Sequence, residues 1–292
     1  DYLVYAVGSH SAEPAVPGAK EHSYPLSTLE QARAVHERLH ATGPAAPVVV
    51  VGGGATGIET AAELAEAGSS VTLVTGGEVG EYLHPAARRE VRRLLGRLGV
   101  TVLEAAEVTA VGAHVVHLAD GRELPSRTTV WTAGFGVPDL AARSGLDTDA
   151  VGRLRTDETL TSTTDDRIVA AGDAAAPSGM PYRMCCAAAL PLGAHAAATV
   201  LARVAGRRPK AFAVPVPGQC LSLGRRLGVF QIARRDDTAT PVYVGGRVGG
   251  WVKEWVTAGN RASLGVSSRR PGLIAGLTTI QDPRRARRLA HG

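Results

Sequence analysis

Cysteine is scarce in this sequence of 292 residues. There are three cysteines, Cys185, Cys186 and Cys220, and no two of them have C-x-x-C or C-x4-C spacing. Three cysteines cannot build a disulfide framework, and without those spacings the chain has no thiol relay. The cysteine content therefore excludes a disulfide-stapled fold and fits a reducing cytoplasm.

Acidic residues are scarce in the last third of the chain. From residue 200 onward there are 17 Lys and Arg against four Asp and Glu, a net charge of +13, whereas residues 1–199 carry −8. This basic segment is either a solvated, arginine-rich surface or a surface that meets an anionic membrane or an acidic protein. No binding motif and no alternation of aromatic and basic residues accompanies the charge, so a nucleic-acid partner is not expected.

The chain also lacks a signal peptide and an initial methionine. It opens at Asp1 in what reads as the middle of a domain, so we expect a further segment upstream. Its length suffices for two domains with part of a third. Residues 184–202 contain no Asp, Glu, Lys or Arg, but abundant alanine with Pro191, Gly193 and His195 favours a buried helix over a membrane span. We interpret His195 as a hydrogen-bonded core residue.

What the sequence does contain is a glycine-rich loop between a strand and a helix. Residues 48–51 are all valine, which predicts a buried parallel strand. Gly52, Gly54 and Gly57 follow in G-x-G-x-x-G spacing, and the next residues predict a helix over about 56–67. These glycines permit a tight turn, close approach of a pyrophosphate and close packing of helix on strand. We therefore predict a dinucleotide diphosphate at the helix N-terminus.

The next strand, over residues 70–75, should end at the adenosine ribose of that dinucleotide. An acidic residue there favours the 2′-hydroxyl of NAD, and a nearby arginine favours the 2′-phosphate of NADP. Thr75 is neither, and the lack of an arginine just after it tilts the prediction toward NADH, with NADPH as the alternative. In the helix predicted over residues 85–98, the arginines should form a solvated face, with Arg88 or Arg89 binding a phosphate as the alternative.

A second strand end carries a carboxylate. Residues 167–173 predict an apolar strand that ends in Gly172 and Asp173. A carboxylate at the carboxyl end of a parallel strand can accept hydrogen bonds from ribose or ribitol hydroxyls. The alternative for Asp173 is that it caps the following helix.

The remaining elements are short. The pattern predicts a helix over residues 26–39, strands over 1–9, 100–103 and 128–134, and an antiparallel meander over 107–124. Beyond residue 206 it predicts strands over 219–223, 228–233 and 241–244 and a helix over 247–257. Trp251 and Trp255 share one face of that helix, either packed in a core or forming a membrane-interface stripe. We expect the arginine-rich tail at 284–288 to be disordered.

In this order the motifs resemble those of the two-dinucleotide flavoproteins, the pyridine nucleotide-disulfide oxidoreductase superfamily. The resemblance covers residues 1 to about 205 and rests on four segments: residues 1–9, the glycine loop, residues 131–134 and residues 168–173. The loop Gly-Gly-Gly-Ala-Thr-Gly-Ile-Glu is most similar to that of type II NADH dehydrogenases and apoptosis-inducing-factor-like oxidoreductases. The resemblance implies FAD and NADH or NADPH as cofactors.

The implied fold is α/β, with two Rossmann-like, three-layer dinucleotide-binding domains and a small α+β C-terminal domain. The expected division is a partial FAD-binding domain over 1–40, an NAD(P)H-binding domain over 41–132, a second FAD-binding segment over 133–205 and the C-terminal domain over 206–292. The cofactor-binding residues are then Gly8, Ser9, Gly52, Gly53, Gly54, Thr56, Gly57, Ile58, Glu59, Thr75, Ala133, Gly134, Phe135, Gly172 and Asp173. The resemblance places Glu59 near the nicotinamide, and neither a catalytic acid or base nor a metal ligand is expected.

Two departures from the family pattern bear on function. The first glycine loop, which holds the FAD diphosphate in the family, is not in this sequence, so its set of FAD-binding residues is incomplete. The glutamine-rich motif on the quinone side of the flavin has no match in residues 186–193, which leaves the electron acceptor unidentified.

We therefore predict a cytoplasmic FAD-dependent NAD(P)H oxidoreductase, either free or peripheral to the inner face of the membrane. The alternatives are a flavin-linked redox sensor or interaction protein with slow turnover, and a fragment that binds NAD(P)H only.

Overall fold

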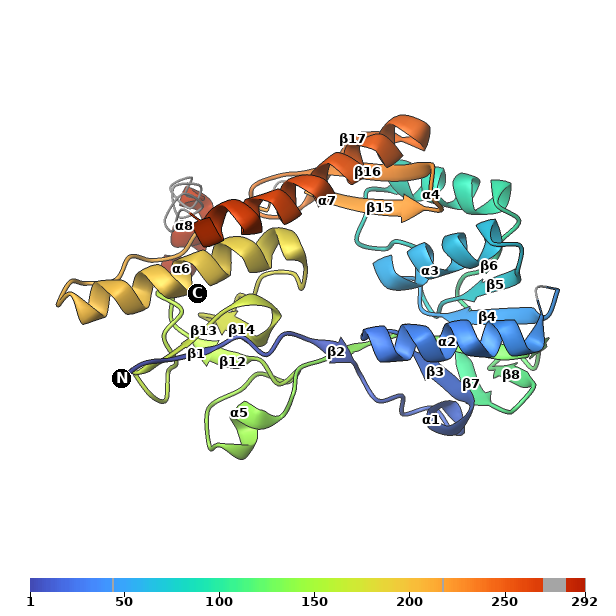
Figure 1. Ribbon diagram of the computed structural model, residues 1–292, viewed down its shortest axis with the longest axis horizontal. Helices are drawn as coiled ribbons and strands as arrows, with labels where there is room; N and C mark the ends of the chain where they lie inside the picture. The colour runs from blue at the N-terminus through green and yellow to red at the C-terminus, as the bar shows by residue number, and fades with distance from the viewer. Residues whose placement is uncertain (44, 217, 270–281, 292) are drawn as a thin grey trace.

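The computed structural model describes residues 1–43, 45–216, 218–269 and 282–291, and it has two lobes (Figure 1). A five-stranded parallel sheet forms the centre of one lobe. Its strands, in spatial order, are β3 (Ser23–Pro25), β10 (Thr128–Trp131), β4 (Pro47–Val51), β5 (Ser70–Val74) and β6 (Thr101–Leu103). The four consecutive valines of β4 are buried. The predicted buried parallel strand is confirmed, because β4 has neighbours on both edges and cover on both faces.

Each face of this sheet has its own cover. Val48 and Val50 point to the face covered by α2 (Leu29–Thr42), α3 (Ala55–Glu66) and α4 (Pro85–Arg97), and they share a core with Ile58. Val49 and Val51 point to the other face and pack with α1 (Ala19–His22) and the meander β7 (Val108–Val111), β8 (Val115–Leu118) and β9 (Glu123–Pro125). Alternate valines of one strand therefore divide the lobe into three layers.

The edge strand β3 was expected in the first FAD-binding segment. It pairs in parallel with β10 instead, and the following helix α2 packs its Val35 into the core of the nucleotide sheet. Helix α2 begins at Thr28, whose hydroxyl accepts from the Gln31 N–H at 3.2 Å in a capping box. Residues 23–42 thus lie with the nucleotide lobe.

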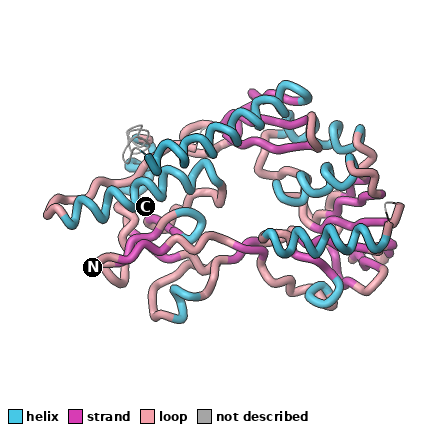
Figure 2. Tube along the Cα trace, viewed as in Figure 1, coloured by secondary structure: helices cyan, strands magenta, loops and turns pink. Residues whose placement is uncertain are grey.

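The second lobe contains shorter parallel pairs and one long helix. Strand β1 (Leu3–Tyr5) pairs with β13 (Ile168–Ala170), and β12 (Leu154–Thr156) pairs with β14 (Ala175–Pro177). The elements η1 (Gly172–Ala174), α5 (Leu140–Arg143) and α6 (Cys186–Val204) complete it. The first two segments that cross between the lobes pair with each other as β2 (His10–Ser11) and β11 (Phe135–Gly136) (Figure 2).

Helix α6 is buried along one face only. Leu192 and Ala196 are buried in a core with Val169, whereas Leu201 and Val204 are exposed. By length and composition alone it could cross a membrane, but the buried face belongs to the core of this lobe. The prediction for His195 is confirmed: the ring is buried, its Nε2 lies 2.8 Å from the Lys210 carbonyl oxygen, and burial lowers its pKa.

The C-terminal part begins with an antiparallel sheet that packs on the nucleotide lobe. Strands β15 (Gly218–Leu223), β16 (Leu227–Ala233) and β17 (Ala239–Gly245) lie over α3 and α4 (Figure 1). Leu221, Leu223 and Val229 belong to the same core as Ile58. Helix α7 (Gly246–Arg269) then runs back toward the other lobe, where the Asn260 side-chain amide lies 3.6 Å from the Cys186 sulfur. The C-terminal part therefore contacts both lobes.

Two predictions for this part are wrong. Core packing of the tryptophans is excluded, because Trp251 is 62% and Trp255 is 68% exposed, with ring centroids 5.6 Å apart.

The arginine-rich tail is a helix, α8 (Pro283–His291), rather than disordered. Its Arg285 is buried, forms two hydrogen bonds of 2.8 and 2.9 Å to the Glu158 carboxylate and lies over the Tyr182 ring. The buried pair of Arg285 with Glu158 therefore lies in a segment whose composition alone predicted disorder.

The shared core predicts that the C-terminal sheet stabilises the nucleotide lobe. Replacing Leu221 by Ala should lower the free energy of unfolding by about 2–4 kcal/mol, because it leaves a cavity between β15 and α3. Urea unfolding followed by circular dichroism measures the change. Leu264→Ala on the exposed side of α7 is the control, with a loss below about 0.5 kcal/mol. Equal midpoints for the two variants would contradict the shared core.

Candidate functional site

The glycine loop between β4 and α3 has the tight geometry that its spacing predicts. Gly52 has φ +123°, and a Cβ there would meet the Thr132 hydroxyl oxygen at 2.6 Å. A Cβ on Gly57 would lie 1.8 Å from the Gly52 carbonyl oxygen. Both positions exclude a side chain because the helix, the loop and the end of β10 touch each other.

Gly54 differs from these two glycines because nothing fills the space beside it. It is the residue before α3 and has extended backbone angles, and no side chain of the described residues caps this helix end. A Cβ on Gly54 would meet no atom within 4 Å. Gly54 and Ala55 are also exposed, so the N-terminus of α3 is accessible and uncapped, which fits an anionic diphosphate.

The other predicted nucleotide residues surround this loop. A Cβ on Gly53 would meet the Thr75 hydroxyl at 2.7 Å, so the end of β5 lies directly against the loop. Ala133 follows Thr132 at the end of β10, and its amide nitrogen is 2.9 Å from the Cβ position of Gly52. Thr56 lies in the first turn of α3, whereas the Ile58 side chain is buried in the core. The structure thus brings together residues that are separated by about 80 positions in the sequence.

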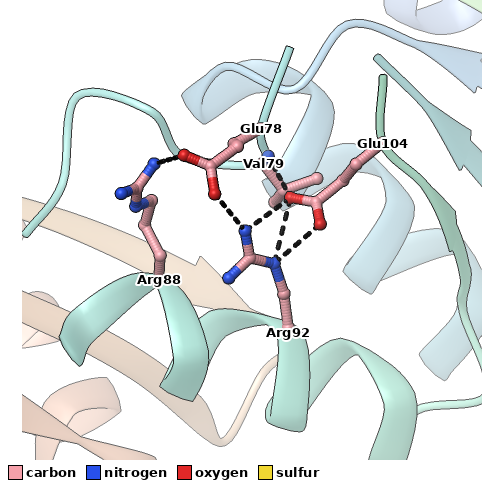
Figure 3. Close-up of polar contacts among 5 residues, drawn as sticks. All are labelled: Glu78, Val79, Arg88, Arg92 and Glu104. Carbon is pink, nitrogen blue, oxygen red and sulfur yellow. Dashed lines mark hydrogen bonds and ion pairs between the residues drawn. The ribbon is translucent and has the colours of Figure 1, made fainter. Parts of the chain in front are cut away.

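The loop after β5 is held by a network of two arginines and two glutamates (Figure 3). The Arg92 guanidinium donates to both Glu104 oxygens at 2.8–3.0 Å and to Glu78 at 3.1 Å, and Arg88 pairs with Glu78. Glu104 also accepts from the Val79 N–H at 2.6 Å. Burial opposes the charged form of Glu104, but Arg92 and the Val79 N–H hold its pKa below the ordinary value.

This network changes the interpretation of the α4 arginines. Arg88 was expected on a solvated face, yet its side chain is only 14% exposed. The alternative was that Arg88 binds a phosphate of the nucleotide, but its guanidinium is already paired with the Glu78 carboxylate. The sequence signal for this pairing is weak, because Glu78 lies ten residues before Arg88 and outside the helix.

Glu59 lies on the side of α3 that faces the C-terminal sheet. Its carboxylate accepts from the Ser222 N–H at 2.7 Å and lies 3.5 Å from the Lys253 amine of α7. Lys253 also contacts the Ser222 hydroxyl. The nearby Tyr82 hydroxyl is buried without a hydrogen-bond partner among the described residues, and burial together with the Glu59 charge raises its pKa. Ser222, Lys253 and Tyr82 were missed by sequence reasoning, because their proximity to Glu59 depends on the docking of a distant sheet.

In the other lobe, the two strand ends predicted to meet the flavin do come together. The Ser9 hydroxyl, after β1, donates to the Asp173 carboxylate, after β13, at 2.7 Å. Gly8 and Gly172 have φ of +71° and +67°, so the backbone turns sharply at both positions, next to this contact. The second Asp173 oxygen accepts no hydrogen bond from the described residues. Asp173 is inside η1 rather than before it, so the helix-capping alternative is wrong.

The lobe crossing contains the last predicted residues. The Ala133 carbonyl accepts from the Trp131 ring N–H at 3.0 Å, and the Gly134 carbonyl accepts from the Ala12 N–H at 3.3 Å. Phe135 is paired with Ser11 across the crossing, and its ring is half exposed. The β2–β11 pairing and the bond between Gly134 and Ala12 hold the two crossing segments together through the backbone.

A cavity of about 500 Å³ lies elsewhere, at the junction of α8, the β16–β17 turn and residues 180–183. Several charged side chains line it, and some of them pair with each other, as Arg183 does with Asp237 at 2.9 Å. None of the predicted site residues lines this cavity.

Most of the chain matches the sequence pattern of one protein family. Residues 1–200 match the sequence pattern of the pyridine nucleotide-disulphide oxidoreductases. The chain belongs to this family. The matched range includes the glycine loop and both Ser9 and Asp173.

Several relatives share this similarity. NADH dehydrogenase-like protein MT1860 of Mycobacterium tuberculosis is 33% identical over 253 residues, covering 79% of this chain and 63% of the relative. NADH dehydrogenase-like protein YutJ of Bacillus subtilis is 25% identical, covering 80% of this chain and 66% of the relative. The chain thus spans about two thirds of the length of these relatives.

Solved structures support the fold. The NDH2 structure from Plasmodium falciparum, in complex with NADH, superposes with a TM-score of 0.72 at 14% identity, covering 88% of this chain and 73% of that one. Putidaredoxin reductase in its complex with putidaredoxin gives 0.65 at 24% identity, covering 80% and 57%. The predicted α/β flavoprotein reductase fold is confirmed.

The empty space beside Gly54 gives a direct test of the nucleotide site. Gly54→Val should fold like the parent, because its Cβ meets no protein atom, but should lose at least tenfold in NADH affinity, because the methyl groups enter the diphosphate space. Fluorescence titration with NADH measures the affinity. Gly57→Ala is the contrasting variant: it should lower the unfolding midpoint, because its Cβ meets the Gly52 carbonyl. If Gly54→Val binds NADH as tightly as the parent, the glycine loop is not part of the nucleotide-binding site.

Proposed function

We propose that this protein is an NADH dehydrogenase-like oxidoreductase that takes electrons from NAD(P)H through FAD to a further acceptor. The observation that carries the proposal is that one chain of this family has both a candidate nucleotide site and a candidate flavin site. One is the unfilled N-terminus of α3 beside Gly54, and the other is the Ser9–Asp173 contact at paired strand ends.

The residues present fit the two cofactors at these sites. When bound, FAD supplies the acceptor for the hydride of NAD(P)H. The α3 N-terminus would hold the nucleotide diphosphate, and the free oxygen of Asp173 would accept from a ribitol hydroxyl while Ser9 orients the carboxylate. The β2–β11 crossing holds the two lobes together. In this proposal the protein contributes binding, orientation and the exclusion of water.

Glu59 contributes orientation in this proposal. Its carboxylate is held by the Ser222 N–H and lies near the Lys253 amine, so its position depends on β15 and α7. By the family resemblance it stands near the nicotinamide. We propose that these contacts fix its direction relative to the bound ring.

The slow-turnover alternative, a redox sensor or interaction protein, is favoured by the exposed tryptophans of α7. Kinetics separate it from the enzyme. The full chain supplied with FAD is mixed with NADH without oxygen, and the loss of flavin absorbance gives the rate of one reduction. Steady-state NADH oxidation with a quinone or a dye then gives turnover. Fast reduction with fast turnover supports the enzyme, and fast reduction with negligible turnover supports the sensor. Nucleotide binding without flavin reduction would leave the chain as an NAD(P)H-binding protein only.

The flavin site has its own test. Asp173→Ala should lose FAD on dilution, because a ribitol hydroxyl would lose a charged acceptor worth about 1.5–3 kcal/mol. The ratio of flavin to protein absorbance after gel filtration measures occupancy. Ser9→Ala, which keeps the carboxylate, should lose less FAD. Full occupancy in purified Asp173→Ala would contradict the assignment.

We also propose that α7 attaches this protein to an anionic membrane. Val248, Trp251 and Trp255 are exposed on neighbouring turns of a helix that also carries Arg247 and Arg261. Tryptophan prefers the membrane interface, and each basic residue near an anionic leaflet contributes about 1 kcal/mol. Such attraction is screened beyond about 8 Å at physiological salt.

Vesicle sedimentation tests this attachment. The protein should bind phosphatidylserine vesicles at low salt, bind less at high salt and bind phosphatidylcholine vesicles poorly. Trp251→Ala with Trp255→Ala should weaken the binding that persists in salt. Leu29→Ala, at an exposed apolar residue in the first turn of α2, should have no effect. If the protein does not bind phosphatidylserine vesicles at low salt, membrane attachment is contradicted, and the basic last third of the chain is a solvated surface.

A further inference from the structure

The carboxyl end of β5 lies against the nucleotide loop, β6 pairs with β5, and each of these two strands is followed by a glutamate. Glu104 comes directly after β6, and Glu78 lies in the loop after β5. That loop touches the glycine loop, since the Gly80 N–H donates to the Gly53 carbonyl at 2.8 Å. In dinucleotide-binding sheets the adenosine ribose lies at the end of the second strand, which is β5 here.

The two glutamates have different surroundings. Glu104 is mostly buried, pairs with Arg92 through both oxygens and holds the Val79 backbone, so its role is to fix the loop. Glu78 is 54% exposed and is the only ion-pair partner of Arg88 among the described residues. The Arg88 Nε is buried without a hydrogen-bond partner among the described residues. Arg88 therefore depends on Glu78 to balance its charge.

We propose that Glu78 is the residue that makes this site select NADH over NADPH. It does so in two ways. Its own charge repels a 2′-phosphate at the end of β5, and it occupies the Arg88 guanidinium that would otherwise bind that phosphate. Thr75, directly after the strand, carries no charge, and the two residues that follow it are glycines, so Glu78 is the first carboxylate beyond β5. The inference rests on the proposed function, in that the nucleotide binds at the glycine loop.

The charges of the network show what removal of Glu78 would do. Two guanidinium groups, Arg88 and Arg92, face two carboxylates, Glu78 and Glu104, so the network is neutral (Figure 3). A neutral residue at position 78 leaves one net positive charge on Arg88, while Arg92 keeps its paired hydrogen bonds to Glu104. Arginine beside the ribose is the feature that accommodates a 2′-phosphate.

The test compares NADH and NADPH affinities of the full chain at one fixed ionic strength, by fluorescence titration. The parent should bind NADH at least fivefold more tightly than NADPH. Glu78→Gln keeps the side-chain size and should tighten NADPH binding about tenfold or more, while NADH affinity changes less than threefold. Adding Arg88→Met to Glu78→Gln should reverse the gain for NADPH. Asp120→Asn is the matched control: it removes the same charge beside Arg122 in the β8–β9 turn and should leave the ratio unchanged.

The outcomes separate this inference from the proposed function. If the parent binds NADH and Glu78→Gln leaves the affinity ratio unchanged, the specificity role of Glu78 is overturned and the nucleotide site stands. A parent that already prefers NADPH, or an equal shift in Asp120→Asn, also overturns it. A parent that binds neither nucleotide overturns the proposed function together with this inference.

Discussion

The close contact between α3 and the glycine loop is the constraint on which the other features depend. Because a Cβ on Gly57 would lie 1.8 Å from the Gly52 carbonyl, the helix sits against the end of β4 with no room to shift. In that position its N-terminus opens beside Gly54, its inner face packs Ile58 on the sheet, and its outer face carries Glu59 to the C-terminal sheet. One helix thereby sets the nucleotide site and the docking of the C-terminal part.

The outer face of α3 also explains part of the charge imbalance of the chain. Glu59, Glu63 and Glu66 are spaced to lie along one side of the helix. Arg225 pairs with Glu63 at 2.5 Å, and its N–H donates to Glu66 at 2.5 Å. Basic residues of the last third therefore meet acidic residues of the rest, as they do again where Arg285 binds Glu158. The exposed pair contributes at most about 1 kcal/mol, so these contacts orient the C-terminal sheet while the buried Leu221 cluster stabilises it.

The parts of the fold that the sequence predicted are those in which neighbouring residues decide the structure. Four valines followed by spaced glycines predict β4, the loop and α3 because strand, turn and helix are all local. Ser9 and Asp173 were each predicted at the end of an apolar strand, and their contact follows because β1 and β13 are parallel neighbours whose ends meet at one edge. Strand β3 is different. Its three residues are too short to show a period, and its place beside β10 comes from α2 packing Val35 on the sheet.

The unpredicted parts depend on long-range packing of charged and aromatic residues. Trp251 and Trp255 have the spacing of a core stripe, and their exposure follows only once Lys253, between them in sequence, turns toward Glu59. In the same way Arg88 has the composition of a solvated helix face, and its burial follows from the loop that brings Glu78 over it. Trp251 and Trp255 are each two residues away from Lys253, and two residues turn a helix by roughly 200°, so the face that binds through Lys253 leaves both rings outside. The contact that anchors α7 to the nucleotide lobe is therefore also the reason that its tryptophans face solvent.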